Sequence, residues 1–148
     1  MRISAKGRYA LAAAISMAEN YSNGEYITVI SISEKLGISK IYLEQVFSLL
    51  KRGGIVISVK GAQGGYQLAR VPRDITVFDV LSSVETSLFE QAEETVQEKA
   101  PEFEAAMRAL VFDTIDSTIN ETLESITLYD LVNEAEKHKT DQGLMFFI

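Results

Sequence analysis

A short amphipathic helix that leads directly into a glycine-rich hairpin, over residues 38–68, constrains the fold of this chain more than any other feature. Ser39 is a good helix N-cap, and an apolar face follows at i, i+3, i+4 and i+7 through Leu43, Val46, Phe47 and Leu50. Two glycines end the helix, and two strands, residues 55–59 and 66–69, flank the loop that comes next. This order predicts a DNA-binding winged helix.

The segments around this unit complete the expected fold, which is mainly α with a two-stranded wing. Helices are expected over residues 4–20 and 28–36, and Gly37 leaves a very short turn before the third helix, as a helix-turn-helix requires. Another short helix is expected over residues 76–85, followed by an acidic connector and a long helix that begins near Pro101. A last helix is expected over residues 127–136, ahead of an apolar tail.

The long helix carries an apolar stripe that is longer than a small domain can cover. The residues expected to form its contact surface are Phe103, Met107, Leu110, Val111, Ile115 and Ile119. We predict that this stripe packs on its copy in a second subunit, since twofold homodimers are the commonest oligomers. The alternative is that the stripe folds back onto its own domain.

Charge divides the chain into two unequal parts. Residues 1–75 carry ten Lys and Arg against five Asp and Glu, a net charge of +5, whereas residues 76–148 carry four against sixteen, a net charge of −12. A basic first half can supply phosphate contacts, and an acidic second half is kept away from DNA. We therefore expect a winged-helix DNA-binding domain over residues 1–85, and an acidic connector, dimerisation helix and tail over residues 86–148. The alternative is that the charges merely cover solvated faces.

Residue content excludes several kinds of site. The chain has no cysteine, which excludes disulfides, thiolate nucleophiles and thiolate-bound zinc or iron-sulfur clusters. His138 is the only histidine, and the carboxylates of residues 85–104 lie in a polar run where no apolar pocket would raise a pKa. Neither a nucleophile elbow nor a Walker motif is present. We expect no enzymatic activity, no metal and no cofactor.

The N-terminal segment imitates a secretory signal, because basic residues precede an apolar run. The run is mostly alanine, however, and a helix capped by Ser4 explains it better. Since no segment approaches the ~20 apolar residues of a membrane span, the expected location is the cytoplasm.

The first turns of the third helix hold the candidates for contacts to base edges in the major groove, namely Ser39, Lys40, Ile41, Tyr42, Glu44 and Gln45. Gln45 can bond adenine at two positions, Glu44 can accept from cytosine N4, and Ile41 can touch a thymine methyl. Tyr42 is either a packing residue or a phosphate donor. Lys60 at the wing tip is placed to enter a minor groove or bind a phosphate, unless the loop is simply a flexible hairpin.

Three sequence blocks together resemble the Rrf2 family of bacterial winged-helix repressors: MRISAKGRYAL at residues 1–11, YLEQ at 42–45 and SVKGAQGGYQL at 58–68. The resemblance implies a homodimer, joined by a long C-terminal helix, whose two heads bind duplex DNA at a pseudo-palindromic operator. It also implies DNA contacts at Lys6, Tyr42, Glu44, Gln45, Lys60 and Gly61. Many members have arginine at the position of Lys60, and lysine reads a narrow groove less selectively.

Family members that carry an iron-sulfur cluster place three cysteines after the wing, whereas residues 87–101 here contain none. The resemblance therefore points to a cluster-free member of the branch that represses cysteine metabolism, because the apolar C-terminal ending is similar. That branch works with cysteine synthase as a partner, which implies that Phe147 and Ile148 dock on such an enzyme through the terminal carboxylate. The alternative, which we favour, is that the tail packs on the dimer body.

Overall fold

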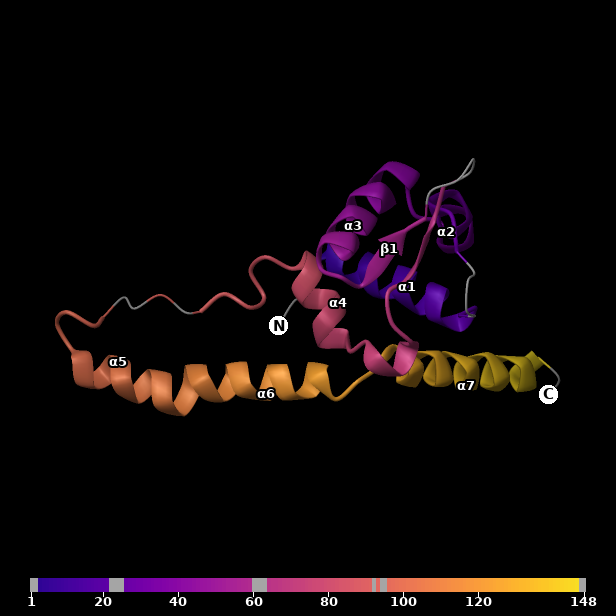
Figure 1. Ribbon diagram of the computed structural model, residues 1–148. Coiled ribbons are helices and arrows are strands. Elements are labelled where there is room, and N and C mark those ends of the chain that lie inside the picture. Colours follow the sequence, from indigo (N-terminus) through magenta and orange to yellow (C-terminus); the bar gives the residue numbers. More distant parts are fainter. Residues whose placement is uncertain (1–2, 22–25, 60–63, 92, 94–95, 147–148) are drawn as a thin grey trace.

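The computed structural model describes residues 3–21, 26–59, 64–91, 93 and 96–146 of the chain (Figure 1). Its elements, in chain order, are α1 (Ala5–Glu19), α2 (Val29–Leu36), α3 (Lys40–Arg52), β1 (Val56–Ser58), β2 (Tyr66–Leu68), the 3₁₀ turn η1 (Pro72–Asp74), α4 (Val77–Val84), α5 (Pro101–Met107), the π-helical turn η2 (Arg108–Phe112), α6 (Asp113–Glu124) and α7 (Leu128–Phe146). The first half forms a helical head, and the second half forms an extended row of helices along one side of it (Figure 1). This architecture confirms the predicted fold class.

Capping side chains set the helix boundaries of the head. The hydroxyls of Ser4, Thr28 and Ser39 accept hydrogen bonds from backbone N–H groups in the first turns of α1, α2 and α3. Gly37 ends α2 with a φ of 68°, in the left-handed region that suits glycine, and so allows the tight turn into α3. The predicted helices over residues 4–20, 28–36 and 39–52 are confirmed to within one residue at each end.

The wing is a short antiparallel pair held close to the head. Val56 pairs with Leu68 and Ser58 with Tyr66, and Ile27, which precedes α2, forms a further bridge to Tyr66. A Cβ atom at Gly65 would approach the Tyr26 ring to 2.8 Å, so this contact requires glycine. Both predicted strands are therefore present, although each is slightly shorter than expected.

One apolar core joins these elements. The largest of its fully buried side chains is Phe47 of α3, whose ring stacks on Tyr66 of β2 with centroids 4.7 Å apart. Arg70 braces the base of the wing, because its guanidinium donates to the Gly54 and Asp74 carbonyls and pairs with Asp79 at 3.3 Å. α3, the wing and α4 are thus held as one unit.

The long helix is not a single α-helix. A π-helical turn over Arg108–Phe112 separates α5 from α6. Residues spaced by four drift about 40° per step around a straight α-helix, and a wider π turn offsets this drift. The apolar residues of the stripe recur at every fourth position, and the π-helical turn is consistent with this spacing. An α-helical pattern alone does not predict such a turn.

The last helix runs ten residues further than the predicted end at residue 136, which corrects that expectation. No proline interrupts these residues, and Glu134 forms an i, i+4 pair with His138 at 3.3 Å that supports the added turns. Lys139 also reaches Glu19 of α1 at 3.7 Å, and Leu128 is fully buried in the core of the head. α7 therefore packs against the head along α1 (Figure 1).

Within the described residues, no helix combines the length and the apolar character needed to cross a membrane.

Candidate nucleic-acid interface

One face of α3 is buried and the other is open to solvent. Leu43, Val46, Phe47 and Leu50 are completely buried, as the apolar spacing predicts. On the opposite face the side chain of Ile41 is 71% exposed, and it lines a shallow depression with Glu44 and Gln45. These three residues are the ones whose chemistry matches base edges, so the fold presents them together on an accessible surface.

The first turn of α3 is fixed by its cap and carries a weak ion pair. The Ser39 hydroxyl accepts from the Tyr42 backbone N–H at 3.4 Å, while Lys40 pairs with Glu44 at 3.7 Å. More than half of each charged side chain is exposed, so this pair contributes little to stability and can rearrange at low cost. Lys40 and Glu44 are therefore available to another partner.

Tyr42 packs between helices. Its ring meets Tyr9 of α1 edge to face, with centroids 5.2 Å apart, and it lies against the core of the head. The sequence allows Tyr42 to be either a packing residue or a phosphate donor, and the structure shows packing contacts for it. This contact connects α3 to the helix that carries Lys6.

The start of α1 is tied to the end of α4. Glu85 Oε1 accepts from both the backbone N–H and the hydroxyl of Ser4, at 3.0 and 2.7 Å. A Cβ atom at Gly7 would overlap this carboxylate, so the approach of the two helices depends on glycine there. Lys6 lies on this first turn and is half-buried.

Arg8 is a candidate that the sequence reasoning missed. Its exposed side chain lines a depression with Tyr9, Leu36 and Ile38, beside the turn that leads into α3. Arg8 follows Lys6 by two positions and precedes an apolar run, and this position in the sequence is the signal that could have identified it. Lys60 and Gly61, by contrast, lie outside the described residues.

Several cations of the basic half are already engaged in the fold. Lys35 pairs with Glu19 at 2.8 Å, Arg70 with Asp79, and Arg73 lies 4.1 Å above the Tyr129 ring. Lys35, with the help of Lys139, lowers the pKa of Glu19, and hydrogen bonds from Asn133 and Arg73 lower the pKa of Tyr129.

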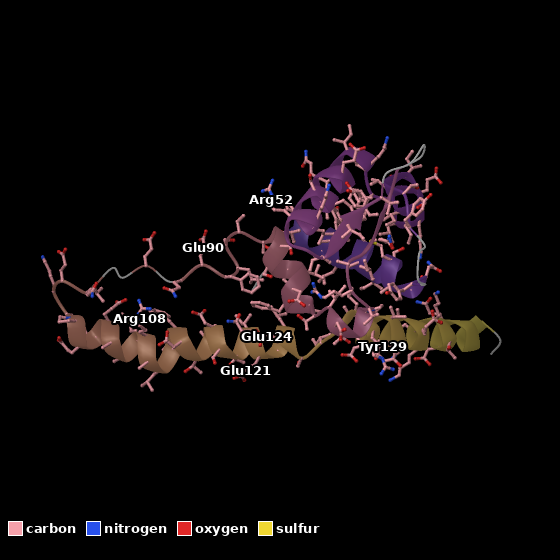
Figure 2. All side chains as sticks on the ribbon, in the orientation of Figure 1. Arg52, Glu90, Arg108, Glu121, Glu124 and Tyr129 are labelled. Atoms are coloured by element: carbon pink, nitrogen blue, oxygen red, sulfur yellow. The ribbon has the colours of Figure 1, made fainter. Side chains whose placement is uncertain are left out.

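Other cations in the described part of the head have neither an ion pair nor a ring contact. In the described residues of the head, these cations are Lys6, Arg8, Lys51 and Arg52. Arg52 projects from the end of α3 into solvent (Figure 2). Such cations are free to meet phosphates.

Comparison with known proteins gives a consistent result. The model of the Rrf2 family, described as an iron-dependent transcriptional regulator, matches residues 3–134. The HTH-type transcriptional regulator IscR of Pectobacterium atrosepticum is 35% identical over 136 residues, which cover 92% of this chain and 82% of that protein.

Two solved structures are similar over most of their length. T. potens IscR superposes with a TM-score of 0.73 and 36% identity, covering 99% of this chain and 96% of that one. CymR (YrzC), the global cysteine regulator of B. subtilis, has a TM-score of 0.71 and 34% identity, covering 90% and 98%.

The family description implies iron, and the donor atoms of this chain do not fit it. The sequence has no cysteine to supply thiolates, which are the usual ligands of iron-sulfur clusters. Among the residues with a described position, no three histidine or carboxylate side chains gather closely enough to hold a metal ion. The described residues therefore offer no set of ligands for iron.

Proposed function

This chain belongs to the Rrf2 family of transcriptional regulators, and we propose that it acts as a homodimeric repressor that binds a pseudo-palindromic operator without an iron-sulfur cluster. The observation that carries the proposal is the exposed face of α3, where Ile41, Glu44 and Gln45 line one accessible depression. Its place of action is the cytoplasm, where a bacterial operator lies.

The proposed division of labour follows contact chemistry. In this scheme Gln45, Glu44 and Ile41 read base edges, and Ser39 and Lys40 fix the N-terminus of α3 in the major groove. Tyr42 orients α3 through Tyr9. The proposed phosphate and minor-groove contacts come from Lys6, Arg8, Lys60 and Gly61.

The proposed dimer uses the exposed part of the stripe. Phe103, Leu110 and Ile115 expose 64%, 79% and 51% of their surface, and large apolar side chains in a row are typical of an interface. Val111 continues this row, and Met107 is half-buried beside it. Ile119 instead packs on Leu81 of α4, next to Leu123 of its own helix. In the proposed dimer, one part of the stripe therefore contacts the second subunit and the other part contacts the chain's own head.

The regulated genes we propose are those of cysteine or sulfur metabolism. CymR, which is named a global cysteine regulator, is 34% identical to this chain, and the chain lacks thiolate ligands. IscR proteins are equally similar in sequence, so this assignment rests on the missing cysteines. The docking of Phe147 and Ile148 on cysteine synthase remains a prediction, because both residues lie outside the described part of the chain.

The test is to sequence DNA fragments bound in cells and then to measure affinity for the recovered operator. Gln45→Ala should weaken operator binding by about tenfold, since a good base contact is worth ~1–3 kcal/mol, and should leave random DNA unaffected. Gln142→Ala, an exposed glutamine of α7, is the matched control. Equal effects of the two variants, or no sequence preference in the wild type, would refute the proposal.

A further inference from the structure

A cavity of about 340 Å³ lies where the head meets the long helix. Its apolar walls come from three elements: Phe78 of α4, Leu88 and Phe89 of the linker after α4, and Ile119 of α6. The two phenylalanine rings meet edge to face with centroids 5.2 Å apart, which fixes the linker against α4. The volume is at the lower end of the range for small-molecule sites.

The polar part of the cavity is negatively charged. Asp113 and Asp116 lie one turn apart on α6, with Asn120 one turn further, and all three line the cavity. Among the described lining residues none is basic, and neither carboxylate has an ion-pair or hydrogen-bond partner in the described part of the chain. Two unpaired carboxylates beside an aromatic wall are complementary to an organic cation that carries an apolar group.

The proposed dimer contact leaves this cavity open. The exposed stripe contains Val111 and Ile115, whereas the cavity uses Asp113, Asp116 and Ile119. Successive residues of an α-helix lie about 100° apart, so Ile115 and Asp116 point in different directions. A second subunit on the stripe therefore does not need to fill the cavity.

The cavity is also connected to the DNA-binding end of the head. The linker that supplies Leu88 and Phe89 leaves α4 at Glu85, whose carboxylate holds the Ser4 cap of α1. α1 carries Lys6 and Arg8, and its Tyr9 packs on Tyr42 of α3. A ligand that braces the linker against α6 thus acts on the segment that positions α1.

We propose that this cavity is an effector site for a small organic cation, in which an apolar group lies against Phe78 and Phe89 and an ammonium group binds Asp113 and Asp116. Occupancy changes operator affinity through Glu85 and α1. The claim that occupancy changes operator affinity rests on the proposed function, whereas the claim that the cavity binds a ligand does not.

The first experiment measures binding to the full chain by calorimetry without DNA. The probes are phenethylamine, the neutral phenethyl alcohol and the anion hydrocinnamate, which share a ring and a short chain and differ in charge. Only the amine should bind, and Asp116→Asn or Asp113→Asn should weaken it by about tenfold. Glu121→Gln removes the same charge from α6, on the side away from the linker, and should have no effect (Figure 2).

The outcomes decide the proposal without reference to DNA. Both aspartates are exposed and asparagine has the same shape, so unchanged thermal unfolding shows that a loss of binding is local. A loss confined to the two cavity variants supports the site. Equal binding of the three probes, equal weakening by Glu121→Gln, or no binding of the amine would overturn it.

The second experiment measures operator affinity with and without saturating phenethylamine. A change of at least about fivefold is expected, and it should disappear in Asp116→Asn. If the amine binds and operator affinity does not change, the proposed effect on DNA binding is overturned and the ligand site is not. If the free protein binds no operator, the proposed function fails, and the calorimetric result still decides the site.

Discussion

Truncation of Leu110 tests the proposed dimer most directly, because Leu110 is the most exposed large apolar side chain in the described part of the chain. Full burial of a leucine is worth ~1.5–3 kcal/mol, and about four fifths of its surface is available to a partner. Leu110→Ala therefore removes about 1.5 kcal/mol per subunit. A twofold interface contains the residue twice, so the dimer loses about 3 kcal/mol and its dissociation constant rises about a hundredfold.

Sedimentation equilibrium across a range of concentrations measures this change. Val71→Ala, which also shortens an exposed apolar side chain but lies outside the stripe, is the control and should leave the dissociation constant unchanged. Helix content by circular dichroism should be the same in both variants, since Leu110 contributes little to the packing within one subunit. A wild type that stays monomeric, or a Leu110→Ala dimer as tight as the Val71→Ala dimer, would show that the stripe is not the interface.

Three further changes test the head. Glu19→Gln should cost about 1 kcal/mol of unfolding free energy at neutral pH, because Lys35 and Lys139 lower the pKa of Glu19 in the folded state. This contribution is present above the unfolded pKa and is lost as the pH falls through the lowered pKa of folded Glu19, so the difference in urea unfolding between the variant and the wild type should shrink as the pH is lowered through the acidic range. Gly37→Ala should destabilise the fold by about 1 kcal/mol in the same assay, since φ is 68° there although nothing crowds the position; an unchanged midpoint would contradict the role given to this turn. Tyr42→Phe keeps the ring contact with Tyr9 and should retain operator affinity if packing is its role, whereas a tenfold loss would identify the hydroxyl as a phosphate donor.

The parts of the fold that were predictable depend on local chemistry. Ser4 and Ser39 are capping residues at the start of helical segments, and both caps form as expected. Gly37 is similar, because a left-handed turn residue between two short helices has few other uses. These signals lie within a few residues of the structure that they specify.

The features that were missed depend on partners distant in sequence. Spacing along one segment predicts neither the hydrogen bonds that Ser4 donates to Glu85 nor the ion pair of Lys139 with Glu19, although this ion pair stabilises the longer α7. The packing of Tyr42 likewise required the position of Tyr9. The packing of Ile119 with Leu81 and Leu123 likewise depends on where α4 crosses α6, whereas the role of the stripe as a dimer contact stays a prediction.

The same distinction explains why a regulatory site can exist here without any sequence motif. α6 presents Ile119 and Leu123 to the head, Ile115 to solvent on the stripe, and Asp116 to the cavity. Because these residues share one helix of twelve residues, a change in the angle of α6 alters the head contact, the proposed dimer contact and the cavity together. In the proposed dimer the two heads are positioned through α6, so a ligand that binds one arrangement of α6 better than another is expected to shift operator affinity.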